Sequence, residues 1–302
     1  METSSDAGPG SPADAGGVGV RQDPALIPEA GVREGSPATA DLVVRDDAAA
    51  FPALRDAAKA RRGTGAPLRL IDAGALPGPE LEWLGRAGAA IYSSDAAGRT
   101  GRELVLVSDA ARKGRAFVSY FHHGPFAEGD AGGGPVVFAD LLEFGRSGLR
   151  LYVSNAKIPR DFGALDALAY ACEKGGSAFG YYHHGPLTHG LEDLARRGAW
   201  IHVDIRSASE PGSGEPAPAT DEAALLLADC ARAAHATGAG IVLHIDAAVD
   251  PVRLADWMAA GVHLLFLTPP RDYRSPLRPL EEKARRRPLD PRAYYLYPAF
   301  ML

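Results

Sequence analysis

The sequence is poor in cysteine and in long apolar runs, and each shortage argues against a class of protein. Cys172 and Cys230 are the only cysteines among 302 residues, and both lie among Ala and Leu. They are expected to be small core residues, because two such positions make neither a disulfide framework nor a metal-binding pair. No stretch has the length and apolarity of a membrane-spanning helix. The N-terminus lacks a basic segment followed by an apolar one, so a cytoplasmic protein is expected.

The chain also lacks an excess of positive charge. Its formal net charge is −6 and its pI is about 5.9, so no general basic field favours nucleic acid or an anionic membrane. One local basic run, Lys283–Arg287, follows two glutamates and is interpreted as a solvated helix end. The expected partner is a small-molecule ligand or substrate, with no nucleic acid and no membrane. The oligomeric state stays open.

The chain divides into two regions of different composition. Residues 1–40 consist mainly of Gly, Pro, Ser, Ala and Asp, which offer little to bury, so a disordered tail is expected there. Residues 41–302 contain regularly spaced apolar runs and are expected to form a single domain.

Those apolar runs alternate with segments of helical spacing, the pattern of a parallel sheet with crossover helices. Strands are predicted at eight places: 68–73, 90–94, 116–122, 150–154, 178–183, 199–205, 240–246 and 262–267. Residues 41–45 and 293–297 could each add one more strand, which gives a count of eight to ten.

A longer period runs through the alternation. The motif Gly85-Arg-Ala-Gly-Ala-Ala-Ile-Tyr92 returns at Gly145–Tyr152, at Ala195–His202 and, more loosely, at Met258–Leu265. A strand–helix–strand–helix module is therefore used about four times, which favours a (β/α)₈ TIM-barrel-like parallel barrel. The alternative is an open parallel α/β sheet.

The most distinctive repeat is a histidine phrase at strand ends. Tyr120-Phe-His-His-Gly-Pro125 returns as Tyr181-Tyr-His-His-Gly-Pro186. His183 follows His122 by 61 residues, and His244 follows His183 by the same number. In a barrel, equal spacing predicts that these three histidines lie in one layer at the carboxyl ends of neighbouring strands, where barrel active sites form.

Side-chain alternation then predicts what else lines the barrel. The aliphatic residues of 241–245 should pack on the helices, which turns His244 and Asp246 inward. By the same reasoning, together with the histidine repeat, the remaining inward residues are His122, His183, Tyr120, Tyr181, Tyr92, Tyr152, Ser94, Ser154, Trp200, His202 and Asp204.

Converging imidazoles and carboxylates are the ligands of zinc-like ions and the groups of acid–base catalysis. The leading hypothesis is a metal-assisted hydrolase of a small polar substrate, in which His122, His183 and His244 bind a divalent metal such as zinc. Asp204, Asp246 and His202 are the candidate catalytic residues in this scheme. The candidate substrate-binding residues are Tyr92, Tyr120, Tyr152, Tyr181 and Trp200.

The His-rich strand ends are similar to those of metal-dependent hydrolases of the amidohydrolase and PHP types. Those families have a His-x-His pair at the end of the first strand, whereas this chain has Leu70-Ile71-Asp72. No residue role is therefore carried over, and no family membership is claimed. The alternative hypothesis is a non-catalytic barrel that binds a ligand or partner and has a hydrogen-bonded His/Tyr core.

Overall fold

The computed structural model describes residues 42–64, 67–126, 136–204, 221–245 and 251–266. The strands are β1 Leu42–Arg45, β2 Leu68–Ile71, β3 Ala90–Ser94, β4 Val118–His122, β5 Arg150–Ser154, β6 Phe179–His183, β7 Trp200–Asp204, β8 Ile241–Ile245 and β9 His263–Phe266. All eight predicted strands are present, and β1 confirms the additional strand predicted near residue 41. The possible strand at 293–297, the basic run and the N-terminal tail lie outside the described residues.

Helices alternate with these strands along the whole described chain. They are α1 Phe51–Arg61, α2 Gly78–Arg86, α3 Gly101–Lys113, α4 Phe138–Arg146, α5 Phe162–Lys174, α6 His189–Arg196, α7 Asp221–Thr237 and α8 Pro251–Ala259, and the short 3₁₀ helix η1, Asp95–Ala97, follows β3. The even-numbered helices have eight or nine residues and the odd-numbered ones eleven to seventeen. This alternation confirms the predicted module.

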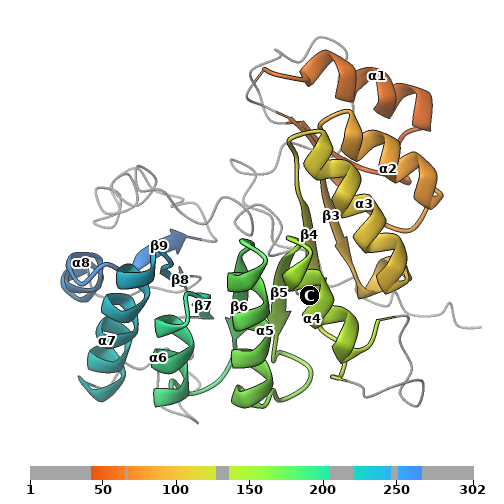
Figure 1. Ribbon diagram of the computed structural model, residues 1–302. Coiled ribbons are helices and arrows are strands. Elements are labelled where there is room, and N and C mark those ends of the chain that lie inside the picture. Colours follow the sequence, from red (N-terminus) through yellow and green to blue (C-terminus); the bar gives the residue numbers. More distant parts are fainter. Residues whose placement is uncertain (1–41, 65–66, 127–135, 205–220, 246–250, 267–302) are drawn as a thin grey trace, which may run out of the picture.

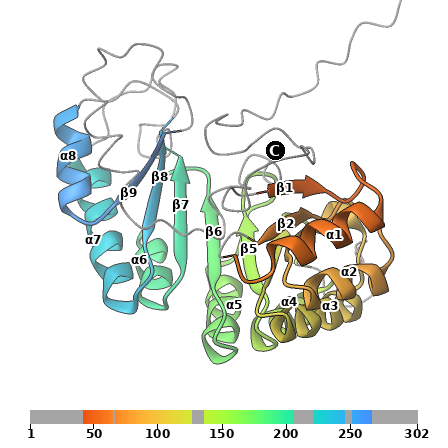
Figure 2. The same ribbon diagram turned by 90° about the horizontal axis from the view of Figure 1, so that it is seen from above.

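The nine strands form one parallel sheet in the strict order β1 to β9. Figure 1 and Figure 2 show the sheet bending, with the helices along its outer side. An open doubly wound sheet reverses its strand order and carries helices on both faces. Sequential order with helices on one face is the winding of a (β/α) barrel, so the predicted α/β class is confirmed. None of the pairings described joins β1 to β9.

The repeated glycine motif has a packing role between paired helices. A Cβ on Gly145 of α4 would stand 2.8 Å from the backbone nitrogen of Cys172 in α5. The equivalent Gly85 of α2 meets Ala111 of α3 at 3.1 Å. Glycine therefore lets the short helix of a module lie against the long helix that follows it, which explains why the motif recurs ahead of β3 and β5.

The two faces of the sheet have different cores. Leu, Ile and Val side chains of the strands pack with the helices in a large cluster that also contains both cysteines, buried and unpaired as predicted. The opposite face holds a smaller aromatic cluster formed by Ala90, Tyr92, Phe121, Tyr152 and Tyr182. Alternate residues of one strand thus serve two different environments. Among the described helices, none has the length and apolarity to cross a membrane.

Candidate functional site at the carboxyl ends of the strands

The repeated His-His-Gly-Pro phrase builds a turn. The Nε2 of His122 is 3.3 Å from the carbonyl oxygen of Pro125, and the Nε2 of His183 is 2.9 Å from that of Pro186. Each first histidine ends its strand and closes the turn that follows, by donating its ring N–H to the proline carbonyl. This contact explains the phrase as a structural element that two modules share.

Asp95, the residue after β3, holds the first of these turns in place. One carboxylate oxygen accepts from the Tyr120 hydroxyl at 2.6 Å and lies 2.9 Å from Nδ1 of His122. The other accepts from the backbone N–H groups of His123 at 2.8 Å and Gly124 at 2.7 Å. Burial by itself raises the pKa of Asp95, but the hydrogen bonds and charge of these neighbours outweigh it and hold that pKa well below its usual value.

The same arrangement recurs in the neighbouring modules. Asn155, the residue after β5, accepts from the backbone N–H of His184 at 2.7 Å and donates to its carbonyl at 2.9 Å. Asp46, the residue after β1, accepts from the N–H groups of Ala73, Ala75 and Leu76. An Asp or Asn after one strand therefore binds the backbone beyond the next strand. Sequence analysis missed this role. The similar endings of two strands, Ser94-Asp95 and Ser154-Asn155, could have indicated it.

The predicted layer of three histidines is wrong. The register pairs Ser94 with Phe121, Ser154 with Tyr182 and Asp204 with His244, each first-named residue being the last of its strand. His244 thus occupies the position of Phe121 and Tyr182, one residue before that of His122 and His183. Since one residue reverses the face in a strand, His122 and His183 point to the helix side and His244 to the opposite side. Equal sequence spacing failed because the two intervals share only their total of 61 residues, while the segments within them differ: α5 has 13 residues and α7 has 17.

Tyr120 and Tyr181 share the face of these two histidines, so their predicted inward orientation is also wrong. Tyr120 packs edge-on against Phe144 of α4, with ring centroids 5.2 Å apart. Tyr181 contacts Phe162 at the start of α5, at 6.4 Å. Both tyrosines belong to the cluster that joins sheet and helices, where they support the turns.

The other predicted inward residues do lie on the face that carries no described helix. Tyr92 and Tyr152 are in the aromatic cluster of that face, Trp200 contacts His263, and His202 stacks on Tyr182 with ring centroids 4.2 Å apart. Asp204 shares the parity of Trp200 and His202 in β7. Asp246 lies outside the described residues.

Two buried histidines meet on this face. Nδ1 of His202 is 3.0 Å from Nε2 of His244, and each residue is only 2% exposed. Burial lowers the pKa of His244 to about 3, with a smaller contribution from the charge of His184. Burial, followed by the charges of His244 and His263, lowers the pKa of His202 well below its usual value. Both imidazoles are therefore neutral at pH 7, and one donates its ring hydrogen to the other.

His184, the second histidine of the repeated phrase, lies near this pair. It is partly exposed, and burial lowers its pKa while the charge of Asp204 opposes that change. Its Nε2 is buried and has no hydrogen-bond partner within the described part of the chain, whereas its backbone is fixed by Asn155. Sequence analysis assigned His184 no role. The true register places it beside His244 and Asp204.

The residues present do not fit the predicted zinc-like centre. Both ring nitrogens of His122 are engaged, one by Asp95 and one by Pro125, and His244 lies across the sheet from it. Within the described ranges no group of three or more His, Cys, Asp or Glu side chains is arranged to hold a metal ion. The donor set that the metal hypothesis required is therefore dispersed over two faces.

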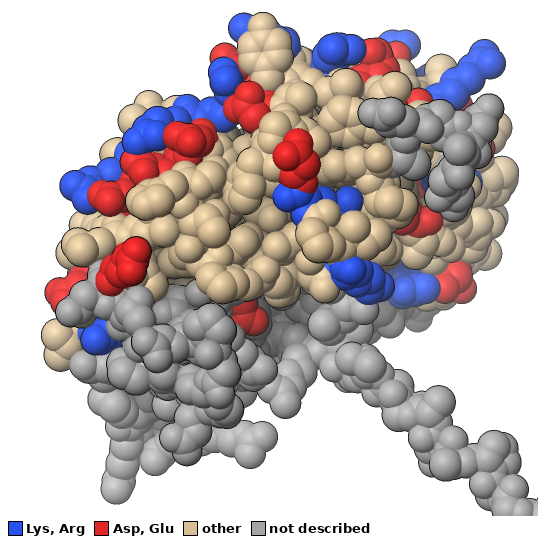
Figure 3. Space-filling model, turned by 90° about the horizontal axis from the view of Figure 1, so that it is seen from below, with Lys and Arg blue, Asp and Glu red and all other residues tan. Residues whose placement is uncertain are grey.

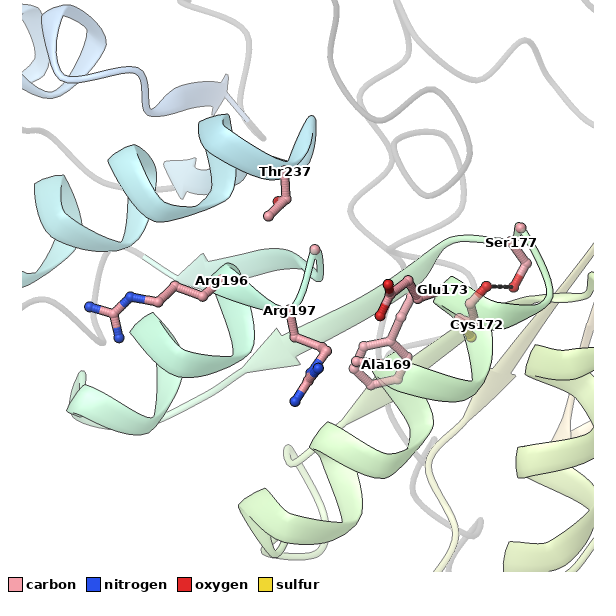
Figure 4. A pocket seen from close by; sticks show the side chains of 10 residues that line it. Ala169, Cys172, Glu173, Ser177, Arg196, Arg197 and Thr237 are labelled. Atoms are coloured by element: carbon pink, nitrogen blue, oxygen red, sulfur yellow. Dashed lines mark hydrogen bonds between the residues drawn. The ribbon is translucent and has the colours of Figure 1, made fainter.

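A hollow of about 520 Å³ lies elsewhere, at the amino ends of β6 and β7 (Figure 4). Glu173, Arg196 and Arg197 line it, and both arginines already pair with neighbours: Arg197 with Asp166, Arg196 with acidic residues of its own helix. In barrels this end serves stability, so the hollow is not the candidate site. On the face in Figure 3, Lys and Arg intermingle with Asp and Glu.

Comparison with known proteins adds little beyond the fold. No family model matches the chain, and no curated protein matches it. Among solved structures, an N-isopropylammelide isopropylaminohydrolase from Burkholderia multivorans is similar over 72% of this chain and 49% of its own, with 16% identity and a TM-score of 0.37. The chain thus spans about half the length of that enzyme.

Two further solved structures are similar over most of their own length. A deoxyribose phosphate aldolase from Aeropyrum pernix covers 82% of this chain and 91% of its own, with 14% identity and a TM-score of 0.33. An aldolase/citrate lyase family protein from Burkholderia cenocepacia covers 77% and 98%, with 14% identity and a TM-score of 0.33. Likenesses this distant carry no conclusion about chemistry.

Proposed function

We propose that this protein is an enzyme that acts on a small polar molecule by acid–base catalysis. The site lies on the inner face of the sheet, at the carboxyl ends of β6, β7 and β8. The observation that carries the proposal is the buried, neutral His202–His244 pair beside His184 and Asp204. A neutral imidazole in contact with the substrate, such as that of His184, can accept a proton from it, and strand carboxyl ends are where barrels place such groups.

Each of the four residues has a distinct role in this proposal. His184 and Asp204 are partly exposed and contact the substrate. His244 and His202 lie behind them, stay neutral because burial lowers the pKa of both, and fix the polar surroundings of His184 and Asp204 through their 3.0 Å contact. Tyr182, stacked on His202 at 4.2 Å, holds the orientation of that ring. The predicted reaction, hydrolysis, remains part of this proposal. In it, His184 or Asp204 deprotonates a water molecule that attacks the substrate, and no metal ion is required.

A second candidate is a binding barrel without catalysis. The rings of Phe121, Tyr152 and Tyr182 follow one another across the inner face, with centroids 4.8 and 6.3 Å apart, and all three are buried. Such a row fills space and stabilises the fold whether or not chemistry follows.

One experiment separates the two candidates. The wild-type protein is incubated with a mixture of small polar metabolites in H₂¹⁸O and, separately, in D₂O, and products are followed by mass spectrometry. Acid–base catalysis predicts ¹⁸O incorporation for hydrolysis, or deuterium incorporation for proton abstraction from carbon. The double variant His202→Phe/His244→Leu should lose this activity, while His189→Gln, on an exposed side chain, should retain it.

The outcome for the variants decides the interpretation. A wild-type protein that converts nothing, with a double variant at least as stable, would support the binding barrel. A double variant as stable as the wild type is expected if the pair only fills the core. Replacing both hydrogen-bond partners by apolar groups of similar shape changes the free energy of unfolding little. Equal turnover by wild type and double variant would also refute the proposed role of the histidine pair in catalysis.

A further inference from the structure

Arg160 is a buried arginine at the carboxyl end of the sheet. It lies between β5 and α5, which stand side by side in Figure 1, and only 9% of the residue is exposed. Its Nε donates to the carbonyl oxygen of Ser154 at 2.8 Å. Its guanidinium lies over the ring of Phe126, with Cζ 4.5 Å from the ring centroid. These two contacts fix the guanidinium plane in one orientation.

The same guanidinium lacks the partner that its charge requires. Nη2 of Arg160 is buried and has no hydrogen-bond partner among the residues that the structure describes. Over the described ranges, no carboxylate lies within ion-pair distance of Arg160, whereas the buried Arg99 pairs with Asp72 at 2.8 Å. Burial lowers the pKa of Arg160, and the charge of Asp95 opposes this only in part. A buried charge without a counter-ion is costly, so binding of an anion at this position would be favourable.

The surroundings add positive charge. Lys157 is exposed on the same loop, and its charge and that of Arg160 both act on the neighbouring His123. The next residue of that turn, Gly124, belongs to the backbone held by Asp95. The loop thus combines a fixed fork of N–H donors with a second cation at the edge of the sheet where barrels bind ligands.

We propose that Arg160 forms an oxyanion-binding site, which takes a carboxylate or phosphate group of a small ligand. Its free Nη2 donates to the oxyanion, and Lys157 contributes its charge from the solvent side. The site does not depend on the proposed acid–base catalysis at His184 and Asp204, because it predicts binding that is measurable without turnover.

The test is a thermal-unfolding titration of the full-length protein with inorganic phosphate and, separately, with acetate, at ionic strength held constant with chloride. A saturable rise in the melting temperature is expected for at least one of the two, of about 2 to 4 °C at tenfold excess over the dissociation constant. The preferred anion identifies the ligand group.

Two variants make the test specific. Arg160→Met keeps packing on Phe126 and should abolish the saturable response. Arg150→Met is the matched control, because Arg150 starts the same strand and also lies over a phenylalanine, with Cζ 3.4 Å from the Phe117 ring centroid. It should respond as the wild type does. A wild type without a saturable response to either anion would overturn the proposal, as would an unchanged response in Arg160→Met.

A second measurement covers the case in which Arg160→Met does not fold. The Nε–Hε signal of Arg160 in the ¹⁵N-labelled wild type, assigned through Arg160→Lys, should shift saturably as the bound anion is added. A signal that stays in place while other arginine signals move would place the anion elsewhere and refute the assignment.

Discussion

The buried histidine pair predicts a specific loss of stability in mild acid. His202 and His244 are neutral in the folded protein, because burial lowers the pKa of both, that of His244 to about 3. In the unfolded chain a histidine titrates near 6.5. Above that pH the two histidines are neutral in both the folded and the unfolded protein, so they cause no loss of stability. As the pH falls from about 6.5 toward 3, only the unfolded chain takes up the proton, so the folded state loses stability.

The magnitude follows from the difference between the folded and unfolded pKa values. Each pH unit within that window costs about 1.4 kcal/mol for each such histidine. His244 alone should therefore cost about 2 kcal/mol between pH 7 and pH 5, and His202 adds to this in the same direction. In a protein whose whole stability is about 5 to 15 kcal/mol, such a loss is readily measured.

Urea unfolding at pH 7 and pH 5, followed by circular dichroism, measures this loss. The double variant His202→Phe/His244→Leu should lose at least about 2 kcal/mol less than the wild type over that interval. His189→Gln is the control: its side chain is 88% exposed, and it should follow the wild type. If the double variant loses as much as the wild type, the pair is not held neutral by burial and the reasoning fails.

Three further predictions concern buried polar contacts at the strand ends and packing within the sheet. Each is measured as the free energy of unfolding in urea. Asp95→Ala leaves four donors of the first turn without their acceptor and should cost about 3 kcal/mol or more, and a cost below about 1 kcal/mol would contradict its role. Arg99→Met leaves the buried Asp72 carboxylate without its 2.8 Å partner and should cost about 3 to 5 kcal/mol, most of which Asp72→Leu in the same chain should restore. Gly180→Ala would place a Cβ 2.3 Å from Cδ1 of Tyr152 and should cost about 1 to 3 kcal/mol, whereas a neutral result would mean that the ring can shift freely.

Much of the fold was predictable because its signals are local. Apolar runs with helical segments between them predicted eight strands within a few residues of their observed bounds, and the glycine motif predicted the alternation of short and long helices. The inward positions of Trp200 and His202 were also predictable, since their strand has an aliphatic side and a polar side. Parity within one strand needs no knowledge of any other strand.

The site was less predictable, because it depends on how one strand aligns with the next. The 61-residue spacing placed His244 level with His183, but hydrogen-bond register places it level with Tyr182. One residue of difference moved two of the three expected ligands to the helix side. The same step brought His184, to which the sequence analysis had assigned no role, next to His244.

The sequence by itself determined the modular α/β class, the strand positions and the polar side of β7 and β8, because periodicity and turn residues act over short distances. Only the tertiary structure decided which histidines meet. The register, set by loop and helix lengths and by Asp and Asn residues that bind the next strand, determines which residues face one another. In the tertiary structure the first histidine of each repeated phrase closes the turn that follows its strand. The register also placed the buried pair and Arg160 at the end of the sheet where chemistry is expected.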